Sequence, residues 1–203
     1  MKKIDRILEN VQKEVELYGK SGLDNVFMTN VQFTIPAGEF VAPASCDVEG
    51  AICDVSWFFK CAKEKMVVPC GNPDTSFFIK HFGVDVIPYG PSWSLKSLKD
   101  HLKDPDTRRG VLMNYSHPAK PACVTGYHFQ SVDYGVLDCT VSMRSSDVCN
   151  VLAQDVFMSG LILQEICDIS GYEPGSLTFN LNNAHVYYKD LQYSEEYTID
   201  YGD

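Results

Sequence analysis

Cys123, Arg144 and Asp155 bring a thiol, a guanidinium and a carboxyl group into one part of the chain, and Arg144 opens the run Arg144-Ser145-Ser146-Asp147. A thiolate nucleophile needs a nearby cation, and an anionic substrate needs a fork of N–H donors, which a guanidinium supplies. A carboxyl group can read the polar edge of a heteroaromatic base. These residue types therefore indicate a cleft for a thiol reaction on an anionic, ring-containing ligand.

The charge balance limits the partners that such a cleft can serve. The formal net charge is −10, which argues against a nucleic-acid polymer or an anionic membrane, because either needs a basic face. A small anion remains compatible with this balance. The four arginines are Arg6, Arg108, Arg109 and Arg144. Taken alone, the Arg108-Arg109 pair is more often an ordinary surface feature than a binding site.

The cysteines do not indicate a disulfide framework or a metal site. Eight cysteines occur, at positions 46, 53, 61, 70, 123, 139, 149 and 167, and no two of them form a Cys-x-x-Cys pair. The sequence also shows no secretory signal and no run of eighteen apolar residues. We therefore expect reduced thiols, no bound metal, no membrane association and a cytoplasmic location.

Hydrophobic periodicity and turn residues predict a single α/β domain over residues 1–203. On the second helix we expect Ile52, Val55, Phe58 and Phe59 to face inward, with Asp54 among these apolar neighbours. Gly171 is the expected helix stop, and residues 173–175 are expected to form a turn. Phe77, Phe78 and Phe82 are the expected inward residues of an irregular segment. Helices are expected at 4–17, 49–63, 94–104 and 156–170, strands at 26–35 and 108–115, a hairpin at 124–132 and 136–143, and a last strand carrying His185 and Tyr187.

Several short motifs together resemble the thymidylate synthase family in order and spacing over most of the chain. They are Asp54-Val55-Ser56-Trp57, Tyr89-Gly90-Pro91-Ser92-Trp93, Asp104-Pro105-Asp106-Thr107-Arg108-Arg109, Cys123, Arg144-Ser145-Ser146-Asp147, Asp155 and Ala184-His185-Val186-Tyr187. The resemblance implies a two-layer α+β fold, with a mixed sheet packed on helices and a sheet face that forms a homodimer interface. It also implies transfer of a one-carbon unit from 5,10-methylenetetrahydrofolate to C5 of a pyrimidine nucleoside monophosphate.

The resemblance assigns roles on the nucleotide side of the site. Cys123 would add as a thiolate to C6 of the ring, which makes C5 nucleophilic. Arg144 would stabilise the thiolate and bind the phosphate, with Ser145 and Ser146 beside it. Three further basic residues match phosphate-binding positions: Arg108 and Arg109, which would come from the partner subunit, and, less closely, Lys20.

Further matched residues would bind the sugar and the folate. His185 and Tyr187 match the pair that bonds the sugar hydroxyl, and a spacing of two places both on one face of a strand. Asp147 matches a folate contact. Asp54, where the family has glutamate, and Tyr89 would act in catalysis. Trp57 and Phe82 would contact folate.

Asp155 stands where thymidylate synthases carry asparagine, and cytidylate hydroxymethylases of the family carry aspartate there. An amide both donates to O4 and accepts from N3–H of uracil, whereas a carboxylate only accepts. Cytosine offers an amino donor instead, so Asp155 favours dCMP, or CMP, over dUMP. A carboxylate at this place is also typical of the start of a helix, where the helix dipole favours it.

The sequence departs from the family in four further places. Val124 replaces the usual histidine after the nucleophile. Cys123 is also one residue further from Arg144 than in the family pattern, and we place this insertion in the hairpin at Asp133. Residues 150–154 lack glycine, and the printed sequence ends soon after Tyr187. We therefore expect the usual C-terminal extension to be lacking, so that water rather than hydride completes the reaction.

These observations favour C5 hydroxymethylation of a cytosine nucleotide, and three alternatives remain. They are C5 methylation of dCMP, methylation or hydroxymethylation of dUMP, and nucleotide binding without catalysis. The choice between ribose and deoxyribose stays open, because both nucleotides carry the hydroxyl that His185 and Tyr187 would contact.

Overall fold

The computed structural model describes residues 2–64, 70–82, 90–91, 95–115, 122–133 and 135–191. The helices are α1 (Lys3–Tyr18), α2 (Val48–Glu64), α3 (Phe77–Phe82), α4 (Leu95–Leu102) and α5 (Leu152–Ser170), with a 3-10 turn at Tyr188–Asp190. The strands are β1 (Lys20–Ser21), β2 (Asn25–Ile35), β3 (Gly90–Pro91), β4 (Val111–Tyr115), β5 (Val124–Asp133), β6 (Val136–Met143), β7 (Ser146–Asp147) and β8 (Glu173–Tyr187). None of the helices in this described part is long and apolar enough to cross a membrane.

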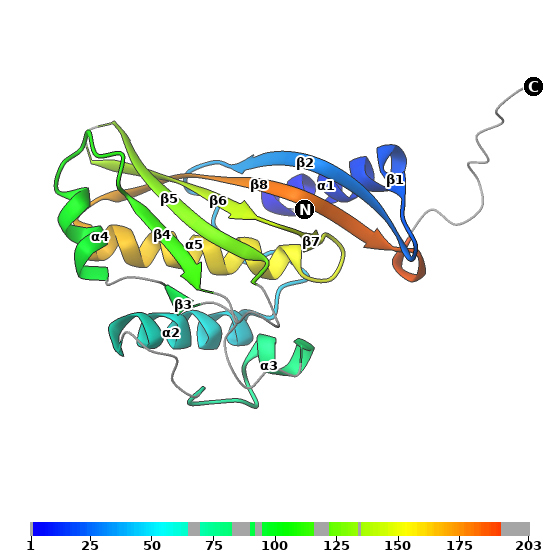
Figure 1. The fold of residues 1–203 in the computed structure, drawn as a ribbon, viewed down its shortest axis with the longest axis horizontal. Helices are drawn as coiled ribbons and strands as arrows, with labels where there is room; N and C mark the ends of the chain where they lie inside the picture. Colours follow the sequence, from blue (N-terminus) through cyan, green and yellow to red (C-terminus); the bar gives the residue numbers. More distant parts are fainter. Residues whose placement is uncertain are drawn as a thin grey trace, which may run out of the picture.

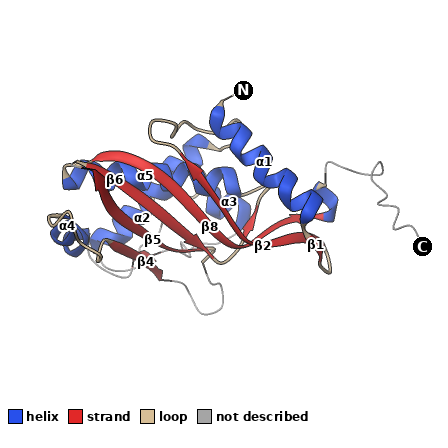
Figure 2. Ribbon diagram, turned by 90° about the horizontal axis from the view of Figure 1, so that it is seen from above, coloured by secondary structure: helices blue, strands red, loops and turns tan. Residues whose placement is uncertain are grey.

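The strands form a mixed sheet in the order β1-β2-β8-β6-β5-β4-β3, and β7 pairs with the end of β8. Helix α5 runs beneath this sheet, and α2 and α3 lie beyond α5 (Figure 1). Helix α1 packs beside β2 and β8, as the view from above shows (Figure 2). The expected mixed α/β fold, with a sheet packed on helices, is confirmed.

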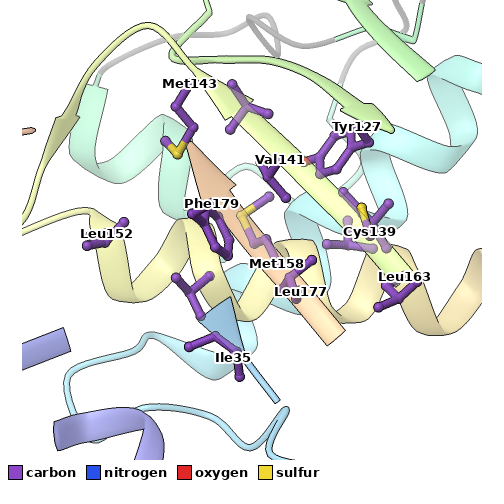
Figure 3. Packing of buried hydrophobic residues seen from close by; sticks show 14 of the residues in the cluster. Ile35, Tyr127, Cys139, Val141, Met143, Leu152, Met158, Leu163, Leu177 and Phe179 are labelled. Carbon is purple, nitrogen blue, oxygen red and sulfur yellow. The ribbon is translucent and has the colours of Figure 1, made fainter. Parts of the chain in front are cut away.

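The core lies between the sheet and α5. Side chains of β6 and β8, among them Val141 and Phe179, meet Met158 and Leu163 of α5 (Figure 3). Phe179 also stacks on Phe33 with ring centroids 5.0 Å apart. Because these strands alternate buried and partly exposed residues, one face of each can be apolar while the other remains polar. This packing holds β6, β8 and α5 in a fixed arrangement.

The predicted hairpin is confirmed as β5 and β6, and α5 then leads into β8, which lies parallel to β6. The predicted turn at residues 173–175 is wrong, because β8 already begins at Glu173. Proline has no backbone N–H to donate to a neighbouring strand, but Pro174 stands near the start of β8, where this loss is tolerated. Gly175 is needed there, since a Cβ would collide with the carboxylate of Asp138, which accepts the Ser176 N–H at 2.6 Å.

Two other expectations need correction. Ile52 was expected to face inward, but half of its surface is exposed, whereas Val55 and Phe58 of the same helix are buried. The predicted start of the long helix at residue 156 is also late, because α5 begins at Leu152. Asp155 therefore lies inside the first helical turn, and its N–H donates to the Val151 carbonyl at 3.1 Å.

In the paired strands β2 and β8, the alternation of buried and exposed side chains shifts by one residue at the same point along both strands. On β2 the buried side chains stand at odd positions at one end, Val31 and Ile35, but at an even position, Val26, at the other. On β8 the buried positions likewise change from odd, at Leu181, to even, at Ala184. At this level Asn30 adopts a left-handed conformation with φ of 58°, which asparagine tolerates better than most residues. Beyond this point Ala184 and Val186 of β8 are buried in the core, so the side chains between them face away from it.

Candidate active site

A cavity of about 420 Å³ opens where the ends of β5, β6 and β8 meet the start of α5. Twelve described residues line it: Asn25, His81, Cys123, Arg144, Ser145, Ser146, Asp147, Val151, Asp155, Asn183, His185 and Tyr187. Eight of these are residues that the sequence analysis assigned to the reaction or to ligand binding. The fold thus brings segments far apart in the sequence to one place.

The β5–β6 hairpin explains why Cys123 and Arg144 meet. Val124 pairs with Met143, so the residue before β5 and the residue after β6 must lie side by side. The Arg144 N–H donates to the Cys123 carbonyl at 2.9 Å, and Nη2 of Arg144 lies 3.7 Å from Cys123 Sγ. A guanidinium this close favours the thiolate form of a cysteine.

The guanidinium of Arg144 is held in place from two further sides. Its Nε donates to the Ala122 carbonyl at 3.1 Å, and its Nη1 donates to Ser145 Oγ at 2.9 Å. Strand β5 contains two one-residue irregularities, one at Ser131–Asp133, where the insertion was expected, and a second at Val124–Gly126 beside the nucleophile. Both leave Cys123 in contact with Arg144.

Short strand β7 places Ser146 and Asp147 against the end of β8. Ser146 pairs with Ala184 and Asp147 with His185. The Asp147 carboxylate accepts the backbone N–H groups of Cys149 at 3.1 Å and Asn150 at 3.2 Å, which fixes the turn into α5. The hydroxyl of Ser146 is buried and has no hydrogen-bond partner among the described residues.

His185 and Tyr187 point into the cavity from alternate positions of β8. Their rings meet edge to face with centroids 5.2 Å apart. Nδ1 of His185 lies 3.1 Å from Oδ1 of Asn183. Burial lowers the pKa of His185 below its ordinary value and raises the pKa of Tyr187, so both rings are neutral near pH 7.

Asp155 is buried, with 3% of its surface exposed, and it lines the cavity from the first turn of α5. Its Oδ2 has no hydrogen-bond partner in the described part of the chain. Burial alone raises the pKa of this carboxyl to about 7. A buried polar atom without a hydrogen-bond partner raises the free energy of the folded protein. A ligand that places a polar group beside Asp155 Oδ2 would remove this cost.

A second, small cavity of about 10 Å³ lies behind Asp155, and Asp54 lines its other side together with Phe58, Phe78 and Tyr127. Such a volume holds roughly one water molecule. Asp54 does not line the large cavity. Its carboxylate accepts the Ser76 hydroxyl at 2.5 Å and the Phe78 N–H at 3.1 Å, while burial raises its pKa. Asp54 therefore anchors the start of α3 from behind Asp155.

Other residues from the sequence analysis lie elsewhere in this chain. Arg108 and Arg109 are exposed between α4 and β4, at the opposite end of the sheet from β7 (Figure 1). Lys20 is exposed on β1, and Trp57 is buried beside a different cavity on the outer side of α2. Tyr89 and the side chain of Phe82 lie outside the described residues.

Four residues that line the cavity were not predicted from the sequence: Asn25, His81, Val151 and Asn183. Asn183 could have been found, because it stands two positions before His185 on the same strand. Asn25 lies opposite Tyr187, and His81 comes from α3. The sequence alone does not show that these two residues line the cavity. Asn25 is placed there by the pairing of β2 with β8, and His81 by the packing of α3.

The folate side is less complete than the nucleotide side. Of the three residues expected to contact folate, Asp147 lines the cavity, Trp57 does not, and the side chain of Phe82 is not described. Asp147 fits a polar group of folate, although backbone donors already engage its carboxylate. Of the expected folate contacts, the described residues therefore bring Asp147 alone into this cavity.

A thiol beside a guanidinium, with a buried carboxyl and two neutral rings around the same cavity, fits the nucleophilic attack on a ring that the sequence predicts. Comparison with known families agrees, since the family model described as thymidylate synthase matches residues 93–198, more than half of the chain. The chain belongs to the thymidylate synthase family. Enzymes of this family transfer a one-carbon unit from folate to C5 of a pyrimidine nucleotide and are typically dimeric.

Proposed function

We propose that this protein hydroxymethylates C5 of a cytosine nucleotide, with dCMP favoured over CMP. The observation that carries the proposal is the buried carboxyl of Asp155, whose Oδ2 has no partner among the described residues and which shares a cavity with Cys123. Cytosine presents an amino donor next to the acceptor N3. A carboxyl that holds a proton donates to N3 with one oxygen and accepts from the amino group with the other.

The thiol carries the covalent chemistry. Cys123 Sγ bonds to C6, and the electron pair of the C5–C6 double bond makes C5 nucleophilic. Methylenetetrahydrofolate, when bound, supplies the one-carbon unit. C5 would bond to that carbon, and loss of the C5 proton would expel the nitrogen of tetrahydrofolate and leave an exocyclic methylene group on the ring. Water then adds to this methylene carbon, and departure of the Cys123 thiolate restores the C5–C6 double bond. Arg144 stabilises the thiolate at both ends of this sequence and binds the phosphate.

The wall of the cavity supports water as the final nucleophile. Among its described lining residues, Val151 is the one aliphatic side chain, and the rest are polar or charged apart from Cys123. Hydride transfer is favoured where water is excluded, and a polar wall holds water instead. Asp54 and Asp155 line the small cavity together, so Asp54 would exchange a proton with Asp155 across it. Asp54 would then act through Asp155, as a positioning residue, without touching the substrate.

The proposal also includes a dimer. Arg108 and Arg109 cannot complete the phosphate site of their own chain from the opposite end of the sheet, but they could serve a partner's site. The sheet face away from α5 carries polar pairs such as Thr34–Thr178, joined at 2.9 Å, and Gln32–Asn180, joined at 2.8 Å. We assign this face to the homodimer interface.

A product assay tests the proposal. Purified protein is incubated with methylenetetrahydrofolate and dCMP, CMP or dUMP in ¹⁸O-labelled water, and the nucleotide is analysed by mass spectrometry. We expect hydroxymethyl-dCMP that contains solvent oxygen, and no product from the Cys123→Ser variant. A methyl product without label would instead show dCMP methylation, and a product from dUMP alone would contradict the role of Asp155.

Release of tritium from C5 of labelled dCMP separates catalysis from simple binding. Thiolate addition to C6 makes the C5 hydrogen labile, so a catalyst releases tritium into water. A protein that binds dCMP but releases none would be a non-catalytic relative. This outcome would overturn the proposed function even if the nucleotide occupies the cavity.

A further inference from the structure

The contact between Asn183 and His185 determines which imidazole nitrogen can carry hydrogen. Asn183 Oδ1 lies 3.1 Å from His185 Nδ1. An amide oxygen only accepts hydrogen bonds, and a neutral imidazole has one N–H donor and one acceptor nitrogen. This contact therefore places the hydrogen on Nδ1. Nε2 is then an acceptor, and it has no hydrogen-bond partner among the described residues.

The charged groups around His185 leave the ring neutral. Burial is the main cause that lowers its pKa, and the guanidinium of Arg144 acts in the same direction. The carboxylates of Asp147 on β7 and Asp24 before β2 oppose this shift without reversing it. Near pH 7 the ring therefore holds one N–H, and the partner of Nδ1 decides where that hydrogen is.

We infer that Asn183 is a positioning residue that holds His185 in the Nδ1–H tautomer and so presents Nε2 to the cavity as an acceptor for a sugar hydroxyl. The sugar contact rests on the proposed function. Burial also raises the pKa of Tyr187, so its phenol remains a donor. The pair then offers one acceptor and one donor, which matches a hydroxyl group that both donates and accepts.

Nitrogen NMR of the whole protein tests the tautomer directly. In ¹⁵N-labelled protein above the titration of His185, long-range ¹H–¹⁵N spectra separate protonated from unprotonated ring nitrogens, and the His185→Gln variant identifies the signals. We expect an N–H at Nδ1 and a bare Nε2 in the wild type, with population moving to Nε2–H in Asn183→Ala. Hydrogen on Nε2 in the wild type would overturn the inference.

A second variant separates positioning from loss of structure. Asn183→Asp keeps an oxygen acceptor at the same place, so we expect the Nδ1–H tautomer to return while the added carboxylate raises the pKa of His185. Asn182→Ala, at the exposed neighbouring position, is the matched control and should leave the spectrum unchanged. If Asn183→Asp and Asn183→Ala give the same tautomer, Asn183 does not set it.

Nucleotide binding tests the sugar contact. We expect the dissociation constant for dCMP to rise about tenfold in Asn183→Ala, and the constant for the 2′,3′-dideoxy analogue, which lacks the hydroxyl, to stay unchanged. Equal losses for both nucleotides would overturn the sugar contact. A wild type with the expected tautomer that binds no nucleotide would refute the proposed function and leave the tautomer assignment standing.

Discussion

Asp155 differs from a surface carboxylate in its state of protonation. Because burial raises its pKa to about 7, the neutral acid is well populated at neutral pH. A neutral carboxyl both donates and accepts, as an amide does, whereas the ionised form only accepts. The ionised form faces O4 of uracil with repulsion, while cytosine can share a proton with it through N3. The proposed selectivity for cytosine therefore depends on both the residue type at position 155 and its burial.

Replacement of Asp155 by asparagine should move preference toward the uracil nucleotide. The amide donates to O4 and accepts from N3–H of uracil, but it cannot share a proton with N3 of cytosine. We expect the ratio of kcat/KM for dCMP to that for dUMP to fall by on the order of 100-fold, measured by tritium release from each nucleotide. An unchanged ratio would refute the account of base reading.

The same variant should alter the pH profile. A raised pKa means that the acid form is complete at low pH and is lost as the pH rises through about 7. For the wild type, kcat/KM for dCMP should fall about tenfold per pH unit above that value. The Asp155→Asn variant should lack this limb, and Asp168→Asn, an exposed carboxyl on the same helix, should keep it.

At the scale of elements, the site depends on the hairpin and on the paired irregularity of β2 and β8. The hairpin brings Cys123 to Arg144 through ordinary antiparallel pairing. The change of phase at Asn30 puts Ala184 and Val186 into the core and leaves His185 and Tyr187 at the cavity. A left-handed residue in a strand is locally unfavourable, and here it accompanies the placement of His185 and Tyr187 in the cavity wall.

Substitution of Asn30 tests this element. Asn30 has a φ of 58°, so Asn30→Val forces a branched side chain into the left-handed region. We expect this variant to lose about 1–2 kcal/mol of unfolding free energy, measured by urea denaturation. Glycine at the same place should cost little.

The matched control for Asn30 is Thr29→Val, an isosteric change at the exposed neighbouring position. It should unfold at nearly the same urea concentration as the wild type. If Asn30→Val and Thr29→Val are equally stable, the left-handed conformation does not constrain the strand.

At the scale of the whole molecule, the proposed phosphate site is incomplete within one chain. Arg144 alone reaches the cavity among the arginines in the described residues. Arg108 and Arg109 are exposed at the far end of the sheet. With a net charge of −10, cations are scarce, and in the proposed dimer each chain would lend Arg108 and Arg109 to its partner's cavity.

Subunit complementation tests the shared site. The Cys123→Ser and Arg108→Ala/Arg109→Ala variants should each be inactive as pure dimers. After unfolding and refolding as an equal mixture, half of the dimers are mixed, and each has one site with both elements intact. We expect activity to return to about a quarter of the wild type. A mixture that stays inactive, while both variants fold and dimerise, would place the two arginines outside the active site.

The sequence by itself determined the elements and the chemistry along them. Regular alternation gave the hairpin, helical spacing gave α1 and α5, and the intervals between Cys123, Arg144, Asp155 and His185 identified the family. These features are local or depend on chain order, so side-chain type and spacing are enough to predict them.

Only the tertiary structure decided how these residues meet. It placed Asp54 behind Asp155 instead of in the large cavity, put Trp57 beside another cavity, and added Asn25, His81 and Asn183 to the wall. It also decided the protonation of Asp155, because the pKa of a carboxyl depends on how much water and charge the fold leaves around it. The sequence identifies the carboxyl at position 155, and its burial by the fold determines whether it can donate a hydrogen bond as well as accept one.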